Sequence, residues 1–454
     1  MAASLTDRLR SVVGSGHLST DADVLAAHSI DHTGRYRGHA SALIRPGSAG
    51  EVAEVLSVCR AAGAHVTIQG GRTSLVAGTV PEHDDVLLST ARLNRIGEVD
   101  TAERRLTVGA GVTLSDLHHA AGRAGLLFGV DLSARDTATV GGMAATNAGG
   151  LRTVRYGNMG EQVLGLQVVL PDGTVLNRRS RVRRDNTGYD LPALFVGAEG
   201  TLGVITELEV RLHHPPAHRI TAVCGFGELA GLIEAAGAFR DLDGIAALEL
   251  IDGAATVLTD EHCGVGAPVA GNWLLLVELV ADRDPTGYLA DALTAVRLDG
   301  EPAVGVDAVA RQRLWQVRES IADVLGVFGP PLKFDVSLPP AQIPGFSRDA
   351  AQVIRSHAPE AIPVLFGHLG EGNLHLNVLR CRSDGETENR LYAAMMELIA
   401  EHGGNVSSEH GVGSRKRAYL GMSREPADIA AMRTVKSAFD PTGSLNRAVL
   451  FDAD

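Results

Sequence analysis

The sequence predicts an α+β protein built from two domains, and three observations support this prediction. The chain has 454 residues, of which 45% are hydrophobic and only 21% are charged, so it can bury sizeable cores. Residues 42–45, 52–62 and 65–68 have the patterns of a strand, a helix and a strand, a βαβ unit that implies a parallel sheet. The double proline at 215–216 then marks a linker to a second region of different character.

Composition excludes several classes of function. The formal net charge of −13 argues against a nucleic-acid partner and against adhesion to an anionic membrane. The four cysteines are scattered and form no CxxC pair, which excludes an iron-sulfur cluster within the chain and argues against a disulfide framework. The chain contains no run of about 18 apolar residues, so we expect no membrane span. Residues 1–10 carry charges where a signal peptide needs an apolar core. We therefore expect a soluble, cytoplasmic protein.

Three segments rich in glycine and other small residues occur in the first half, at 69–75, 138–150 and 197–206. In the first, the glycines allow backbone amides to approach a ligand, and the Thr73 and Ser74 hydroxyls can donate hydrogen bonds, which suits a pyrophosphate. Each segment alone is more often a structural turn. Three of them in order favour a site for an extended dinucleotide.

The second half has an α+β pattern suited to a substrate-binding cap domain. The strands expected there are 220–224, 247–251, 273–280 and 332–338, and helices are expected at 228–239 and 308–324. A further helix is expected at 427–439.

Two histidines bracket a glycine-rich turn in this cap region. Residues 364–366 and 374–379 have strand composition, and the glycines between them favour a tight β-hairpin. Because side chains alternate along a strand, His375 and Asn377 should point to the same face, and the hairpin can bring His368 across to join them.

These residues predict a metal site beside a general base. Two imidazoles, from His368 and His375, together with the carboxylate of Glu409, suit a divalent ion such as zinc and leave positions open for a substrate. His410 would then be a base next to a Lewis acid. The alternative interpretation is that the histidines are solvated hairpin residues and that residues 409–410 begin a surface loop.

The hairpin sequence, Gly367-His-Leu-Gly-Glu-Gly-Asn-Leu-His-Leu-Asn377, followed by Ser408-Glu-His-Gly411, resembles the FAD-linked 2-hydroxy acid dehydrogenases. This group includes D-lactate (cytochrome), D-2-hydroxyglutarate and glycolate dehydrogenases. The three glycine-rich segments resemble the PCMH-type FAD-binding domain, the type found in vanillyl-alcohol oxidase, over roughly residues 38–215. The resemblance implies a fold with a two-subdomain FAD-binding domain and an α+β cap with an antiparallel sheet. It also implies noncovalently bound FAD.

The resemblance also indicates which residues contact FAD. They are Gly70, Gly71, Arg72, Thr73, Ser74, Gly78, Thr139, Gly141, Gly142, Ala145, Thr146, Asn147, Gly149, Gly150, Glu199, Gly200, Ile205 and Asn446. The chain departs from the family pattern at two positions. Arg72 stands where many relatives have a third consecutive glycine, and Arg447 stands where a proline is common, which weakens the inference for Asn446.

Two cationic residues fall where relatives bind a substrate carboxylate. Arg318 offers a two-pronged donor and Lys333 a point charge, while Asn377 would help to orient the substrate. The implied mechanism has the metal lower the pKa of the substrate hydroxyl, His410 take its proton, and a hydride pass from C2 to flavin N5. The product is a 2-oxo acid. A separate acceptor, either a cytochrome, a quinone or an electron-transfer flavoprotein, must then reoxidise the flavin.

The predicted domains are an N-terminal helical segment at 1–37, the FAD-binding domain at 38–216, the cap at 217–404 and a returning segment at 405–454. D-lactate and D-2-hydroxyglutarate are the favoured substrates, with glycolate or another 2-hydroxy acid as alternatives. A zinc hydrolase and a flavin-binding module without a substrate are competing functions. A GxGxxA match at 225–230 would indicate NAD, but it lacks the repeated βαβ halves of a dinucleotide domain. The oligomeric state stays open, with a homodimer as one option, and so does a peripheral contact with a membrane through the electron acceptor.

Overall fold

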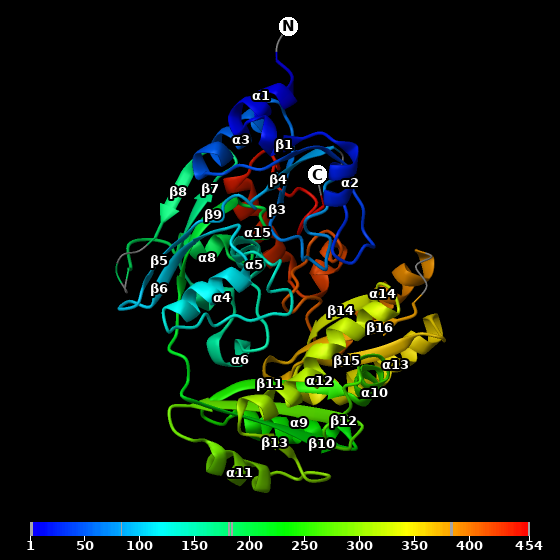
Figure 1. The fold of residues 1–454 in the computed structure, drawn as a ribbon. Coiled ribbons are helices and arrows are strands. Elements are labelled where there is room, and N and C mark those ends of the chain that lie inside the picture. Colours follow the sequence, from blue (N-terminus) through cyan, green and yellow to red (C-terminus); the bar gives the residue numbers. More distant parts are fainter. Residues whose placement is uncertain (1–2, 83, 180–181, 183–184, 382–384, 453–454) are drawn as a thin grey trace. The chain divides into compact units, whose positions relative to one another are not determined.

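The computed structural model describes residues 3–82, 84–179, 182, 185–381 and 385–452. The chain forms two compact units, and each of them combines helices with sheets (Figure 1). The first unit comprises Met1–Gly149, Gly157–His214 and Glu409–Asp454, and the second comprises Gly150–Tyr156 and Pro215–Ser408.

The first unit begins with a four-stranded sheet in the order β1-β2-β4-β3. Its strands are β1 (Leu18–Ser19), β2 (Ala40–Ile44), β3 (Val66–Gln69) and β4 (Asp85–Ser89). β2 and β3 both pair in parallel with β4, so the sheet is parallel as the sequence predicts, but β4 lies between the two strands of the expected βαβ unit. Short β1 pairs antiparallel with β2.

A five-stranded antiparallel sheet completes the strands of the first unit, in the order β5-β6-β9-β7-β8. These strands are β5 (Ile96–Asp100), β6 (Arg105–Gly109), β7 (Val163–Val169), β8 (Val175–Arg178) and β9 (Val204–Arg211). The helices of this unit are α1 (Leu5–Val13), α2 (Ala22–His28), α3 (Ala49–Ala61), α4 (Leu114–Arg123), α5 (Val140–Thr146), α7 (Met159–Gln162), α8 (Leu191–Phe195) and α15 (Pro426–Phe439), with the 3-10 turns η1 (Ser15–His17) and η4 (Arg417–Met422). One apolar core connects both sheets.

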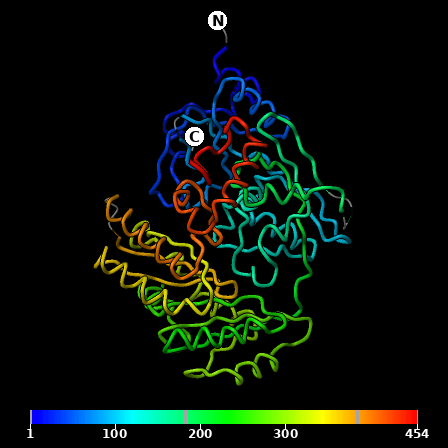
Figure 2. The backbone as a smooth tube through the Cα atoms, turned by 180° about the vertical axis from the view of Figure 1, so that it is seen from behind, coloured from blue at the N-terminus to red at the C-terminus, as the bar shows by residue number. Residues whose placement is uncertain are grey.

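The end of the chain returns to the parallel sheet of the first unit, where the C-terminal segment runs among the earliest segments (Figure 2). After α15, the Asp440 carboxylate accepts hydrogen bonds from the backbone N–H groups of Ser444 and Leu445, at 2.9 and 2.8 Å. Leu445 then forms a parallel bridge with Val66 of β3. Residues 440–446 are thus held against the strand that leads into the first glycine-rich segment.

The second unit is built on a seven-stranded sheet in the order β13-β10-β12-β11-β15-β16-β14, and every pair in it is antiparallel. Its strands are β10 (His218–Phe226), β11 (Ile245–Asp252), β12 (Trp273–Ala281), β13 (Ala303–Gly305), β14 (Leu332–Ser337), β15 (Ile362–His368) and β16 (Asn373–Leu379). Its helices are α6 (Thr153–Tyr156), α9 (Leu229–Arg240), α10 (Gly253–Cys263), α11 (Thr286–Ala295), α12 (Ala308–Val327), α13 (Ile343–His357) and α14 (Glu386–Glu401), with η2 (Pro340–Gln342) and η3 (Leu369–Glu371).

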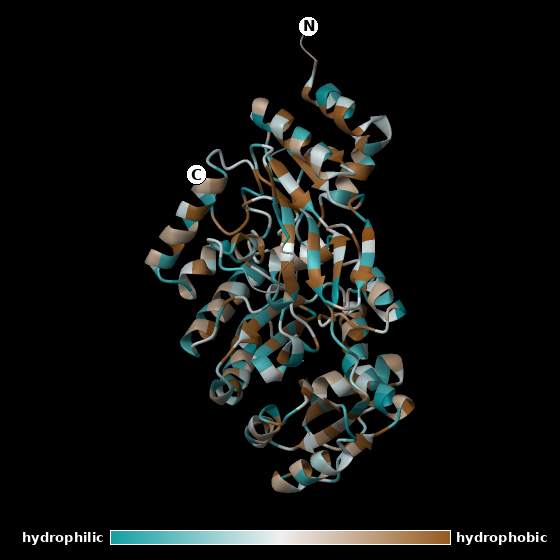
Figure 3. Ribbon diagram, turned by 90° about the vertical axis from the view of Figure 1, so that its left-hand side faces the viewer, coloured by the Kyte–Doolittle hydropathy of each residue, from teal (hydrophilic) through white to brown (hydrophobic). Residues whose placement is uncertain are grey.

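Helices cover both faces of this sheet. α10 and α12 pack on one face, through a core that includes Trp315, Ile251 and Phe366. The other face carries Phe334, whose ring contacts that of Tyr392 on α14. Hydrophobic residues concentrate along the strands, while the helices show a polar and an apolar side (Figure 3). Among the described residues, no helix is both long enough and apolar enough to cross a membrane.

Candidate active site

The three glycine-rich segments line two cavities of about 80 and 200 Å³ in the first unit. The two cavities share lining residues, among them Gly70, Ser74 and Thr146. Sixteen of the predicted FAD-contacting residues line one or both, namely Gly70, Gly71, Arg72, Thr73, Ser74, Gly78, Thr139, Gly141, Gly142, Ala145, Thr146, Gly149, Glu199, Gly200, Ile205 and Asn446. The other two, Asn147 and Gly150, form local hydrogen bonds with Gly160 and Thr153 instead.

Glu409 and His410 also line the larger cavity. The predicted base therefore lies in the same hollow as residues 70–75 and 138–149, although more than 250 positions separate these segments from it in the chain. His410 Nε2 lies 3.7 Å from Glu409 Oε1.

The first glycine-rich segment needs its glycines for contact between loops. A Cβ atom on Gly71 would lie 1.8 Å from the carbonyl oxygen of Thr137, and one on Gly70 would lie 2.4 Å from Thr139 Oγ1. Both distances are far below van der Waals contact, so residues 70–71 can lie this close to 137–139 only without side chains. Close packing of the two loops thus shapes the cavity.

Arg72 has a left-handed backbone conformation with a φ of 57°, which a glycine at this position would adopt easily. Its guanidinium Nη1 donates a 2.7 Å hydrogen bond to the carbonyl of Ala27, near the C-terminal end of α2. The Arg72 side chain therefore ties this loop to the N-terminal helix α2.

Glu199 connects the third glycine-rich segment to the loop that follows His410. Its two carboxylate oxygens accept hydrogen bonds from the backbone N–H groups of Val412 and Gly413, both at 2.8 Å. Burial raises the pKa of Glu199, against the opposing effect of these two donors. Asn446 completes this connection, since its Oδ1 accepts from the Ile68 N–H and its Nδ2 donates to the Glu199 carbonyl.

In the second unit the hairpin β15–η3–β16 arranges its side chains as the alternation predicts. Phe366 pairs with His375 and His368 with Asn373, so both histidines and Asn377 lie on one face of the sheet. The rings of His368 and His375 lie 5.2 Å apart, at right angles to each other. Gly372, at the turn, has a φ of 73°, a left-handed conformation that favours glycine.

Strand β14 adds two more polar residues to the same face. Lys333 pairs with Asn377, and Asp335 pairs with His375. Burial lowers the pKa of Lys333. Asp335 is not among the site residues that the sequence predicts, although its position two residues after Lys333 on a predicted strand places it on the same face.

Arg318 reaches this face from α12 and is buried there, with 7% of its surface exposed. Its Nε donates a 2.7 Å hydrogen bond to Glu249 Oε2, and its guanidinium lies over the Phe366 ring at 4.6 Å. The other oxygen of Glu249 lies 2.7 Å from His368 Nδ1. Glu249 is not among the site residues that the sequence predicts.

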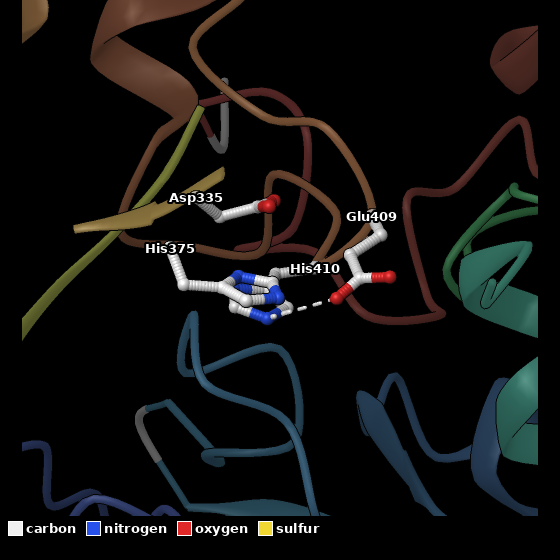
Figure 4. Close-up of side chains that lie close together, drawn as sticks. All are labelled: Asp335, His375, Glu409 and His410. Carbon is white, nitrogen blue, oxygen red and sulfur yellow. Dashed lines mark ion pairs between the residues drawn. The ribbon is translucent and has the colours of Figure 1, made fainter. Parts of the chain in front are cut away.

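Residues 405–408 then run beside β14. Asn405 bridges Ser337, and the Ser408 N–H donates a 2.9 Å hydrogen bond to Asp335 Oδ2. Glu409 and His410 follow directly in the chain. Figure 4 shows four side chains of this stretch and of the two strands, and the ligand atoms of Asp335, His375, Glu409 and His410 all lie within 4.8 Å of one another.

The four-residue group has the composition of a divalent metal site. Two imidazoles and two carboxylates are the donors that zinc takes in proteins. Predicted ligands His375 and Glu409 belong to the group and His368 does not, while Asp335 and His410 complete it.

Comparisons with known proteins show the family of the chain. Residues 215–450 match the family model described as FAD linked oxidases, C-terminal domain, and residues 40–178 match the one described as FAD binding domain. The chain belongs to the FAD-linked oxidases. It is an FAD-dependent oxidoreductase of the D-2-hydroxy acid dehydrogenase family, as the motifs predicted.

Three curated relatives illustrate the similarity. The mitochondrial D-2-hydroxyglutarate dehydrogenase of Danio rerio is 33% identical, over 95% of this chain and 82% of its own length. A putative mitochondrial D-lactate dehydrogenase of Schizosaccharomyces pombe is 34% identical, over 94% and 84%. The D-2-hydroxyglutarate dehydrogenase of Stutzerimonas stutzeri is 32% identical, over 99% of both chains.

Solved structures confirm the predicted fold class. p-Cresol methylhydroxylase with substrate bound has a TM-score of 0.81 at 16% identity, covering 99% of this chain and 96% of its own. The 4-ethylphenol oxidase of Gulosibacter chungangensis has a TM-score of 0.79 at 18% identity, covering 99% and 97%. At this level of identity the likeness extends to the fold alone.

The contact at Gly71 generates a test of the FAD cavity. In Gly71→Ala, the added methyl group must displace the backbone at Thr137. We therefore expect the FAD content of the purified protein to fall about tenfold or more. Gly122→Ala is the matched control, because a Cβ atom there meets nothing within 4 Å. Flavin absorbance per mole of protein measures the effect, and full FAD occupancy in Gly71→Ala would show that the packing of the two loops does not shape the site.

Proposed function

We propose that the enzyme oxidises a D-2-hydroxy acid, D-lactate or D-2-hydroxyglutarate, to the corresponding 2-oxo acid, with metal assistance. The observation that carries this proposal is that His410 lines the cavity formed by the glycine-rich segments and also belongs to the four-residue metal-type group. A base between a cofactor cavity and a Lewis-acid site is suited to removing a proton from a substrate hydroxyl. The similarity to D-2-hydroxyglutarate and D-lactate dehydrogenases supports this class of substrate.

The residues present fit the cofactor. FAD would be held noncovalently by the small side chains and hydroxyls of the two cavities, including Ser74, Thr139 and Thr146. When bound, the flavin supplies a hydride acceptor. Electrons then leave to an external acceptor, a cytochrome, a quinone or an electron-transfer flavoprotein. We further propose that the enzyme works inside the cell.

The metal would be held by His375 and Glu409 of the four-residue group and by the predicted ligand His368, with Asp335 as a further donor. His410, the fourth member of the group, is not counted among the ligands because it serves as the base. When bound, it supplies Lewis acidity toward the substrate hydroxyl. Arg318 and Lys333 bind the substrate carboxylate, and Asn377, opposite Lys333 on the neighbouring strand, helps to orient it. His410 accepts the proton of the C2 hydroxyl at an imidazole nitrogen, so it acts as the base from within the cofactor cavity.

The metal proposal predicts the behaviour of His375→Ala. Loss of one protein ligand should abolish most activity and reduce bound zinc, while flavin absorbance stays intact because His375 lies outside the FAD cavities. His119→Ala, on an exposed position of α4, is a control that should keep both activity and zinc. Zinc is measured by elemental analysis. Normal turnover by protein shown to be free of metal would contradict metal assistance.

The base proposal predicts the behaviour of His410→Asn. Asparagine cannot accept a proton at neutral pH, so flavin reduction by substrate should slow by about 10²- to 10⁴-fold, the usual contribution of positioned proton transfer. Anaerobic stopped-flow measurement of flavin bleaching gives the rate. Near-normal reduction in this variant would assign the base to another group.

The substrate proposal predicts which compounds bleach the flavin anaerobically. D-lactate or D-2-hydroxyglutarate should reduce it, and the L enantiomers and the methyl ester of the better acid should not, because the ester lacks the charge that Arg318 and Lys333 bind. Arg318→Met should lower kcat/KM by a factor that corresponds to about 2 kcal/mol of lost transition-state stabilisation, the value of a charge-assisted hydrogen bond. Equal rates for acid and ester would refute carboxylate binding, and preference for an L acid would refute the stereochemistry.

A further inference from the structure

Helix α2, in the N-terminal segment of the chain, has no role in the proposed function. It spans Ala22–His28 and lies outside residues 40–178, which match the FAD-binding family model. None of its residues is buried, and Val24 and Leu25 are partly buried where they pack against the core. Because a helix of seven residues is marginal by itself in water, the position of α2 depends strongly on contacts at its ends.

The C-terminal end of α2 contacts the first glycine-rich segment. The last carbonyl groups of a helix have no partner within the helix, and two of those in α2 accept hydrogen bonds from this segment. Arg72 Nη1 donates to the Ala27 carbonyl and Gln69 Nε2 donates to the His28 carbonyl, both at 2.7 Å. A guanidinium is also favourable beside the partial negative charge of a helix C-terminus. The two side chains therefore cap α2 from another part of the chain.

Gln69 joins α2 to the cofactor loop, which we define as residues 69–79. Gln69 is buried, with 1% of its surface exposed, and its Nε2 also donates a 2.8 Å hydrogen bond to the Thr79 carbonyl. Because both amide protons go to carbonyl groups, Oε1 is the acceptor for His28 Nδ1, at 3.1 Å. One buried amide thus closes the cofactor loop on itself and fastens it to α2.

The cofactor loop lines both cavities predicted to hold FAD. Ser74 and Thr79 line the two of them, and Arg72 lines the larger one. Within the loop, Ser74 Oγ accepts a 3.2 Å hydrogen bond from the Gly78 N–H. A displacement of α2 would therefore pass through Gln69 and Arg72 to groups that line the cavities.

We infer that the docking of α2 and the binding of FAD are coupled, and that Gln69 and Arg72 are the positioning residues that connect them. α2 holds the cofactor loop in the shape that receives FAD, and bound FAD in turn holds α2. Because such a coupling is reciprocal, a substitution that loosens α2 must weaken FAD binding. The inference depends on FAD binding alone and is independent of the proposed metal, base and substrate.

The N-terminal cap of α2 offers a test that leaves the cofactor loop unchanged. The Asp21 carboxylate accepts hydrogen bonds from the backbone N–H groups of Asp23 and Val24, both at 3.0 Å, and Asp21 lines neither cavity. Asp21→Ala should loosen α2 and weaken FAD binding about fivefold, the equivalent of a lost cap. Asp21→Asn should restore both properties, since asparagine caps a helix equally well. Ser4→Ala is the matched control, because it removes the corresponding cap from α1.

Arg72 offers a second test, from the side of the loop. Asparagine tolerates the left-handed backbone at this position but cannot reach Ala27, so Arg72→Asn should loosen α2 and weaken FAD binding about tenfold. Arg72→Lys keeps a charged donor of similar length and should behave like the wild type. Arg92→Ala is the matched control, because Arg92 Nη1 also donates a 2.7 Å hydrogen bond to a backbone carbonyl, that of Arg45, and Arg92 lines neither cavity.

Two measurements on the purified FAD-loaded enzyme decide the outcome. Hydrogen–deuterium exchange of a peptide that covers residues 20–30 reports the opening of α2. Flavin fluorescence after serial dilution gives the dissociation constant of FAD. Asp21→Ala and Arg72→Asn should show both faster exchange and weaker FAD binding, and the two controls should show neither.

Three results would overturn the inference. Faster exchange with wild-type FAD affinity would show that α2 does not influence the cofactor loop. Unchanged exchange in both variants would show that the caps do not hold α2. Weaker FAD binding in Arg72→Asn with unchanged exchange would show that Arg72 contacts FAD directly and does not act through α2.

Discussion

The register of β16 between β14 and β15 decides which side chains share a face of the seven-stranded sheet. In this register Lys333 and Asp335 lie opposite Asn377 and His375. A slip of one residue would turn the whole polar set of β16 toward the helices on the other face and bring Leu376 onto the polar face in its place. The apolar alternation that buries Leu374, Leu376 and Val378 thus also fixes the polar residues on the opposite face. The register of β16 therefore sets both the core packing and the geometry of the site.

In the first unit the corresponding constraint is the close approach of backbones. Residues 70–71 touch 137–139 where no side chain fits, and Glu199 holds the amides of Val412 and Gly413. Glu199 has a φ of 50°, a strained conformation for a residue with a side chain. The two hydrogen bonds that its carboxylate accepts offset this cost. The loop after His410 is therefore placed by the same segment that lines the cavity.

Short-range periodicity explains what the sequence could predict. The hairpin with His375 and Asn377 on one face, the parallel strands around residues 40–69 and the apolar strands of the cap all follow from local patterns, and the structure contains them. Asp335 needed only alternation along β14, but nothing local distinguished it from a surface carboxylate. Glu249 could not be found in this way, because its contacts depend on strand register and on a helix about seventy residues further along the chain. The direction of Arg72 depends likewise on α2, a segment distant in sequence.

The contacts of buried Glu249 with Arg318 and His368 change how a substitution at Arg318 must be interpreted. Removing the guanidinium leaves Glu249 as a buried carboxylate with one partner, and breaking a buried ion pair costs about 3–5 kcal/mol through the uncompensated charge. A loss of activity in Arg318→Met thus combines two effects, the missing substrate anchor and the disturbed Glu249–His368 pair. A double-mutant cycle with Glu249→Gln separates them, because the two substitutions share the carboxylate contact but not the contact with substrate. If the double variant loses no more stability than Arg318→Met yet still discriminates poorly between acid and ester, the residual defect belongs to substrate recognition by Arg318 itself.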